Sequence, residues 1–260
     1  MKDMRKVFFC LLISALFASP ALAAMSNYAF VQLSRNGTLQ QINEAIRDGA
    51  NVNARVWGNT PLMEAARANT NPGVIASLIE AGADVHARSG YSVYGWTLLM
   101  LAAGNPKLEV ITSLIEAGAD VNARNEQGQT PLMFVALFNP NPEVITPLIE
   151  AGADVHARST AGGTALTMAA SAFYPNPKVI TSLIEAGADV DAKNISGSTA
   201  LMAAASNSNP EVIEVITSLI EAGADPKIRN NDGRMAIDYA KENEVLRNTD
   251  VFRILYDLSF

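Results

Sequence analysis

A seven-residue phrase, Leu-Ile-Glu-Ala-Gly-Ala-Asp, occurs five times in this chain and constrains its fold more than any other feature. The copies occupy 78–84, 114–120, 148–154, 183–189 and 219–225, and a weaker copy occupies 45–51. Their glycines, from Gly49 to Gly223, are separated by 33, 36, 34, 35 and 36 residues. Self-similarity at this period indicates a stacked array of supersecondary units rather than one globular core.

Residues 125–158 illustrate what each repeat is expected to form. Thr130-Pro131 is a helix-start signal, because a threonine oxygen can cap the first turn and proline suits the first helical position. Asn141-Pro142 gives the same signal for a second helix, and Gly152 can adopt the left-handed conformation that ends it. The apolar side chains spaced to share one side of this second helix are Val144, Ile145, Leu148 and Ile149. Each unit is therefore predicted to be two helices followed by a hairpin loop.

These stretches resemble the ankyrin repeat, which joins a Gly-x-Thr-Pro-Leu helix start to a closing Gly-Ala-Asp-Val-Asn-Ala. Here they read Gly-Asn-Thr-Pro-Leu-Met-Glu-Ala-Ala at 58–66 and Gly-Ala-Asp-Val-Asn-Ala-Arg at 118–124. The resemblance implies an all-α, ankyrin-repeat solenoid of about seven helix-turn-helix units with β-hairpin loops. The chain departs from the family at the histidine that follows the leucine, where an apolar or small contact is expected instead. The residues in that slot are Met63, Met100, Met133, Thr167 and Met202.

The repeat domain is expected to span 27–260, in units that depend on one another. Four large aliphatic side chains buried by a second helix contribute roughly 6–12 kcal/mol, which is less than the ordering entropy of about 35 residues. No unit should therefore fold alone. Leu148 is expected inside the line of aliphatics, and Glu150 outside it. The predicted units are 27–55, 56–88, 89–124, 125–158, 159–193, 194–229 and a terminal capping unit, 230–260.

The first 23 residues have the pattern of a secretory signal peptide. A basic segment, 2–6, precedes an apolar run, 7–17, and Ala21-Leu22-Ala23 has the small residues of a cleavage site. The apolar run is shorter than the roughly 20 residues needed to span a bilayer, so cleavage after Ala23 is expected rather than an anchor. The mature chain would then be periplasmic or secreted, as a bacterial exported protein is, and would lack Cys10, the one cysteine.

Charge composition narrows the class of partner. The formal net charge is −7, and cleavage would make it −9, because the leader carries three basic residues and one acidic residue. Nucleic-acid binding favours a clustered basic face instead. The sequence contains no glycine-rich phosphate loop, metal-ligand spacing or activated nucleophile, so we expect no catalysis, no cofactor and no metal. We expect a protein partner, no nucleic acid, no membrane span after cleavage, and a monomeric chain.

Polar residues that repeat with the units are expected to be structural. His86 and His156 fill the same slot two units apart, roughly 20 Å for helices packed 8–10 Å apart, which is too far to share a metal. The aspartates that close the phrase, from Asp84 to Asp225, should hold the turns through hydrogen bonds to the backbone. The basic residues of the loops are expected to screen the glutamate and aspartate rows. They are Arg55, Arg88, Arg124, Arg158, Lys193 and Arg229.

One hairpin loop is longer than the others, and it predicts the site. From Gly82 to Thr97 there are 15 residues, against 11 or 12 in the other loops. Both tryptophans and two of the six tyrosines fall on this finger and the preceding one, and large aromatic side chains are frequent anchors of protein interfaces. The candidate partner-binding residues are Trp57, Asn59, Tyr91, Tyr94, Trp96 and Phe138. Near the end of the next first helix, Phe173 and Tyr174 either bind a partner or close their loop.

The sequence thus favours an exported, non-catalytic scaffold that binds a protein through its hairpin fingers and the concave face that stacked repeats create. A specialised inhibitor, or an immunity-like binder of an exported enzyme or toxin, is the alternative, and the sequence does not separate the two. An enzyme with an unrecognised site is a third possibility, which would need a deep pocket of converging titratable groups. Short, alanine-rich helices argue against such a pocket.

Overall fold

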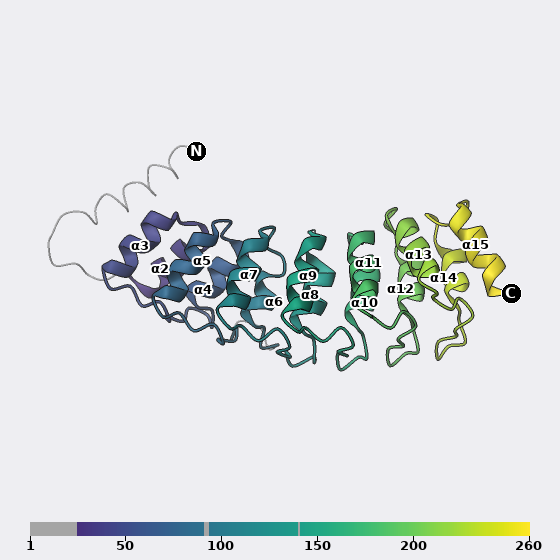
Figure 1. Ribbon diagram of the computed structural model, residues 1–260, viewed down its shortest axis with the longest axis horizontal. Helices are drawn as coiled ribbons and strands as arrows, with labels where there is room; N and C mark the ends of the chain where they lie inside the picture. Colours follow the sequence, from purple (N-terminus) through teal and green to yellow (C-terminus); the bar gives the residue numbers. More distant parts are fainter. Residues whose placement is uncertain (1–24, 91–93, 140) are drawn as a thin grey trace.

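A computed structural model describes residues 25–90, 94–139 and 141–260. The leader, Cys10 and Tyr91 lie outside these residues. The described chain is a row of seven helix pairs, stacked side by side from one terminus to the other, with loops projecting from one end of the pairs (Figure 1).

The first helices of the pairs are α2 (Asn27–Asn36), α4 (Pro61–Ala68), α6 (Leu98–Ala102), α8 (Pro131–Phe138), α10 (Ala165–Ala170), α12 (Ala200–Ser206) and α14 (Ala236–Glu242). The second helices are α3 (Leu39–Arg47), α5 (Pro72–Glu80), α7 (Leu108–Glu116), α9 (Ile145–Glu150) after a 3-10 turn (Pro142–Val144), α11 (Pro177–Glu185), α13 (Val212–Glu221) and α15 (Asp250–Ser259).

The predicted caps start these helices. The hydroxyl oxygen of Thr130 accepts a hydrogen bond from the N–H of Met133, and Pro131 occupies the first helical position. In the second helix of that unit, the Asn141 side chain accepts from the N–H of Glu143. At the other end of the second helices, the phrase glycines have φ between 86° and 91°. Open space surrounds each of them, so the left-handed backbone, rather than crowding, requires glycine there.

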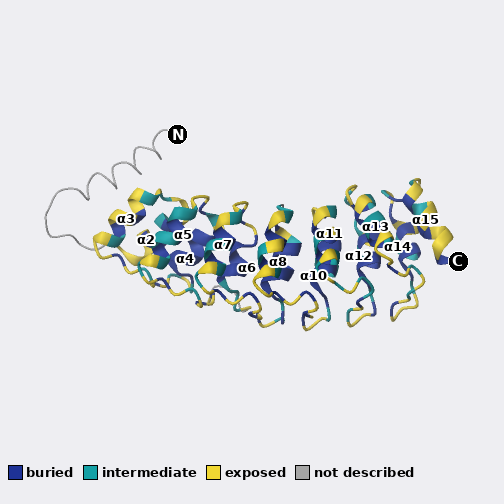
Figure 2. Cartoon of the chain, in the orientation of Figure 1, coloured by how far each residue is buried: buried dark blue, intermediate teal, exposed yellow. Residues whose placement is uncertain are grey.

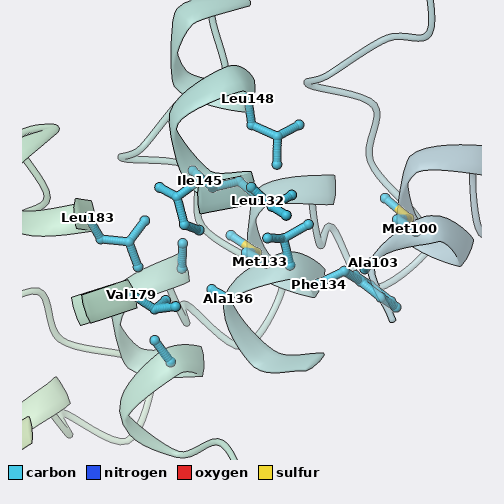
Figure 3. Packing of buried hydrophobic residues seen from close by; sticks show 14 of the residues in the cluster. Met100, Ala103, Leu132, Met133, Phe134, Ala136, Ile145, Leu148, Val179 and Leu183 are labelled. Atoms are coloured by element: carbon cyan, nitrogen blue, oxygen red, sulfur yellow. The ribbon is translucent and has the colours of Figure 1, made fainter. Parts of the chain in front are cut away.

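The core is a continuous line of aliphatic and methionine side chains rather than a ball, and Figure 2 shows it running along the middle of the stack. Leu148 is fully buried and Glu150 is exposed, so the predicted face of the second helix is correct. Around Leu148, Figure 3 places Leu132 and Ile145 of the same unit, with Leu183 of the next unit on the other side. The methionines that replace the family histidine are buried as expected.

The loops fold back as fingers, but they do not form the β-hairpins that were expected. Within the described residues the pairing is limited to two isolated bridges, Val56 with Asn59 and Arg88 with Thr97. Backbone groups connect neighbouring fingers instead. The N–H of Gly90 donates to Gly58, that of Glu126 to Tyr94, that of Thr160 to Gln127, that of Ile195 to Ala161 and that of Asn231 to Ser196. The backbone groups of the fingers therefore form hydrogen bonds with the neighbouring finger as well as within their own finger.

The loop arginines hold neighbouring fingers together through hydrogen bonds to backbone carbonyls, and the expectation that they screen the acidic rows stays a prediction. Arg88 donates to the carbonyl oxygen of Gly95 in its own finger, at 3.0 Å, and to that of Arg124 in the next finger, at 2.9 Å. Arg55, Arg124 and Arg158 donate to the next finger in the same way. The backbone carbonyl oxygens near the fingertips need hydrogen-bond donors. Exposed carboxylates can bond to water instead, so they depend less on the arginines. The phrase aspartates accept from backbone N–H groups two residues later, as expected.

A second ladder joins the ends of the first helices. Asn105 donates from Nδ2 to the carbonyl oxygens of Ala66 and Asn69 in the preceding unit, at 3.0 and 3.1 Å. Asn69, Asn139, Asn207 and Asn243 donate to their own preceding units in the same manner. We call these five residues the asparagine ladder.

Among the described residues, no helix is both long enough and apolar enough to cross a membrane.

Candidate partner-binding surface

Four aromatic side chains form a continuous row from the finger between α5 and α6 across helix α8. The Tyr94 ring stacks on Trp96 with centroids 6.5 Å apart, and Trp96 meets Phe134 edge-on at 5.3 Å. Phe134 in turn lies 5.8 Å from Phe138. Tyr94 is 43% exposed and Phe138 is 56% exposed, whereas Trp96 is half-buried and Phe134 is buried. We call these four residues the aromatic row; its two ends are open and its middle is anchored.

Helix α8 can carry this row because of where its aromatics fall in the helical period. Phe134 and Phe138 are four residues apart, so they share one side of the helix. Phe134 occupies the slot four residues after the N-cap, where its ring meets Trp96 of the preceding unit. The other described units have Phe30, Glu64, Leu101, Met168, Ala203 and Tyr239 in that slot, and none of these described residues makes a ring contact with a tryptophan. The row therefore depends on one unit's sequence and not on the repeat consensus.

Trp57 does not join the row. Its ring meets Tyr28 of helix α2 edge-on, with centroids 5.5 Å apart, and it is 66% exposed. The finger that carries Trp57 is the shortest, and its backbone closes as a two-residue turn in which Val56 and Asn59 exchange hydrogen bonds of 3.0 Å. Both central residues have positive φ, 48° at Trp57 and 81° at Gly58. A bulky side chain normally avoids positive φ values. Among the described residues, Trp57 is the one residue other than glycine that has a positive φ.

Asn59, expected to bind a partner, lies inside the protein. It is buried, its Nδ2 donates to Glu64 Oε1 at 2.7 Å, and its Oδ1 accepts from the Ser89 hydroxyl at 2.7 Å. Arg35 lies 3.9 Å from the other Glu64 oxygen. A buried carboxylate needs such donors, so Asn59 stabilises Glu64 and is unavailable to a partner.

The other predicted residues are placed as follows. Trp96, expected to bind a partner, is half-buried, and its ring packs on the core through Phe134. Phe138 ends helix α8 and is open to solvent. Phe173 and Tyr174 follow helix α10, are 78% and 75% exposed, and meet edge-on at 4.8 Å. Their exposure shows that they do not fill their loop.

Sequence reasoning missed two members of these aromatic contacts, Tyr28 and Phe134. A signal for Phe134 existed, because it lies four residues before Phe138 on the same helix side. Tyr28 gives no such signal, because its contact with Trp57 crosses from one unit to the next.

Comparison with known proteins gives the fold a family. The family model for ankyrin repeats in three copies matches residues 73–159, 99–194 and 166–259. The chain belongs to the ankyrin-repeat family. Among solved structures, the ankyrin repeat domain of human ASB11 matches with a TM-score of 0.73 and 26% sequence identity, covering 87% of this chain and 96% of that one. A search of curated proteins returned no match. Ankyrin repeats are typically non-catalytic scaffolds that bind proteins.

Charge is distributed unevenly over these ankyrin repeats. The phrase glutamates are exposed at the ends of the second helices, from Glu80 to Glu221. The ends of the first helices in the opening units are basic instead, with Arg35 and Arg67 exposed on α2 and α4 and Lys107 exposed beyond α6. A surface that is acidic at one edge and basic at another can orient a charged partner.

The last repeat carries the groups with shifted pKa values. The Asp238 carboxylate accepts from the backbone N–H of Met235 at 2.9 Å, and this bond holds the pKa of Asp238 below its usual value. The hydrogen bond with Glu242, at 2.8 Å, raises the pKa of Arg234. Both groups lie far along the stack from the aromatic row, so they concern the stability of the last ankyrin repeat.

The remaining features of the described repeats offer little chemistry. His86 and His156 are exposed, and no three metal-binding side chains among the described residues come together. A shallow hollow of about 710 Å³ lies between α3 and α5, lined by residues such as Leu39, Ile46 and Glu80. It is open to solvent, and its titratable lining residues are Arg47 and Glu80.

Proposed function

We propose that this chain is an exported scaffold that holds a protein partner on the aromatic row. The observation that supports it most is the combination of open ends and an anchored middle. Tyr94 and Phe138 offer exposed ring surface, while Trp96 and Phe134 fix its position through packing. Pre-positioned aromatic side chains lose little conformational freedom on binding, which is why they dominate many interfaces.

Export rests on the leader. A basic segment, an apolar run and Ala21-Leu22-Ala23 follow in the order that secretion requires. Cell fractionation and N-terminal sequencing test this part of the proposal. A mature N-terminus at Ala24 in the periplasm or the medium is expected, and full-length protein confined to the cytoplasm would contradict it.

Binding is tested by affinity capture with the mature protein. The double variant Tyr94→Ala, Phe138→Ala should weaken capture of the partner by at least about 30-fold, because each desolvated anchor contributes roughly 2 kcal/mol or more and 1.4 kcal/mol is tenfold. Tyr256→Ala is the matched control, since Tyr256 is 48% exposed but lies on α15, at the far end of the stack. Equal loss in both variants, or no loss in either, would contradict a site on the row.

Activity of the captured partner separates a scaffold from an inhibitor. If the partner is an exported enzyme or toxin whose activity falls when the wild-type chain is added, the chain acts as an inhibitor or immunity-like protein. If partner activity is unchanged, a scaffold is indicated.

A further inference from the structure

The ends of the first helices form an ordered rim along the stack. Moving from the first unit to the fifth, the exposed side chains at or just beyond these ends include Arg35, Arg67, Lys107, Phe138 and the pair Phe173 and Tyr174, of which Lys107 is the N-cap residue of α7. We call this set the rim. Its first three units are basic and its next two are aromatic, and the aromatic row meets it at Phe138.

The asparagine ladder fixes the rim in place. Arg67 lies between Ala66 and Asn69, whose carbonyl oxygens accept from Asn105. Phe138 immediately precedes Asn139, which donates to Ala103 at 2.7 Å. The chain at the ends of α2, α4, α6 and α10 is therefore bonded to the next unit, and the end of α8 is bonded to the preceding one.

The usual spacing of packed helices is close to the pitch of an extended peptide. Packed helices lie about 8–10 Å apart, and a polyproline II helix advances about 3.1 Å per residue with three residues per turn, roughly 9.3 Å. A partner segment in this conformation, running along the stack, presents the same face to each unit in turn. The five units of the rim correspond to roughly 10–13 such residues.

Charge indicates what such a segment carries. The whole chain has a net charge of −7 and would repel an acidic ligand elsewhere, yet three cations occupy the basic part of the rim. Of these three cations, Arg35 already lies 3.9 Å from the buried carboxylate of Glu64. Glu109 and Glu143 lie in the first turns that open the second helices, where they complement the helix dipole. Aromatic surfaces that bind polyproline II segments are a recurring recognition mode.

Resting on the proposed function, we infer that the partner binds through an extended, proline-rich segment with an acidic end. Its acidic residues lie against Arg35, Arg67 and Lys107, and its prolines and aliphatic residues lie against Phe138, Phe173 and Tyr174. The basic part of the rim binds the acidic residues of the segment, and the aromatic part binds its prolines. Charge therefore sets the direction in which the segment runs, and the aromatic rings supply most of the contact.

Fluorescence polarisation with synthetic peptides tests this inference on the mature protein. The probe has three glutamates followed by three Pro-Leu-Pro triplets, about twelve residues, and is also made in the reverse block order. Of the two block orders, the one that binds more tightly is then altered. Replacing its glutamates by lysines should weaken its binding at least tenfold. Replacing the prolines by glycines should also weaken it, because the flexible chain must then be ordered on binding.

Variants of the rim provide the matched controls. Arg67→Glu combined with Lys107→Glu should reverse the preference, so that the lysine peptide binds more tightly than the glutamate peptide. Arg67→Gln should weaken the glutamate peptide without reversing the preference. Phe138→Ala combined with Phe173→Ala should weaken both peptides about equally. Circular dichroism melting confirms that each variant is folded.

Two results would overturn the inference: insensitivity to reversed charge, or absence of peptide binding by a chain that still captures its partner through the aromatic row. In the second case the proposed function stands and the inference fails. If the wild-type chain captures no partner and the row variants behave as wild type, the proposed function itself fails.

Discussion

The left-handed conformation of Trp57 should cost stability that a suitable substitution recovers. Two replacements, Trp57→Asn and Trp57→Ala, both remove the ring and its contact with Tyr28, so both lose the roughly 0.5–1.5 kcal/mol of an aromatic pair. They differ in the backbone. Asn followed by glycine is the preferred pair for a two-residue turn with both φ values positive, whereas alanine in this region costs about 1–2 kcal/mol.

Trp57→Asn is therefore expected to be more stable than Trp57→Ala by about 1 kcal/mol, and close to the wild type. Thermal melting followed by circular dichroism measures the difference, which corresponds to roughly 2–4 °C for a chain of this size. The same two replacements at Gln127 form the control, because Gln127 precedes a turn glycine but is absent from the positive-φ residues of the described chain. There the two variants should melt together. Equal melting of the two Trp57 variants would refute the strain argument.

Three further predictions concern stability. Leu148→Ala should cost roughly 2–5 kcal/mol, the usual range for a buried large-to-small change, and Glu150→Ala far less; urea denaturation compares them, and equal shifts would mean that the helix face is wrongly assigned. Asn139→Ala should cost roughly 1–3 kcal/mol, because two backbone carbonyls of the preceding unit lose their donor, and hydrogen exchange should show faster opening at that helix end. The lowered pKa of Asp238, caused mainly by the N–H of Met235, means that its carboxylate stabilises the fold above the unfolded pKa of about 3.9 and that this contribution is lost as pH falls through the lower folded pKa. The stability difference between the wild type and Asp238→Asn should accordingly shrink between pH 6 and pH 3, and a constant difference would contradict it.

The fold was predictable because its signals are local and repeated. Thr130-Pro131 and Asn141-Pro142 each specify a helix start with nearby residues, and Gly152 specifies a helix end through its own backbone. Burial of Leu148 follows from the helical period alone. None of these conclusions needed the distance between two units.

The site was less predictable because its contacts cross from one unit to the next. The aromatics of the fingers were recognised, but nothing in the sequence indicates that Trp96 reaches Phe134 of the following unit while Trp57 reaches Tyr28 of the preceding one. The burial of Asn59 has the same origin, since Ser89 belongs to the next unit. The hydrogen bonds of Arg88 were missed for a related reason: its acceptors are backbone carbonyls, which every residue has and no side-chain pattern reveals.

The hydrogen bonds between fingertips make the units interchangeable. Each middle finger donates one backbone N–H to the finger before it and offers one carbonyl to the finger after it, as Glu126 donates to Tyr94 and Thr160 donates to Gln127. Removing the unit 125–158 would leave the N–H of Thr160 facing the carbonyl of Tyr94, with neither group unsatisfied. Duplication of a unit would likewise add one donor and one acceptor together. Such a chain can gain or lose whole repeats during evolution without breaking its fingertip bonding, while its binding residues, which belong to particular units, change with each event.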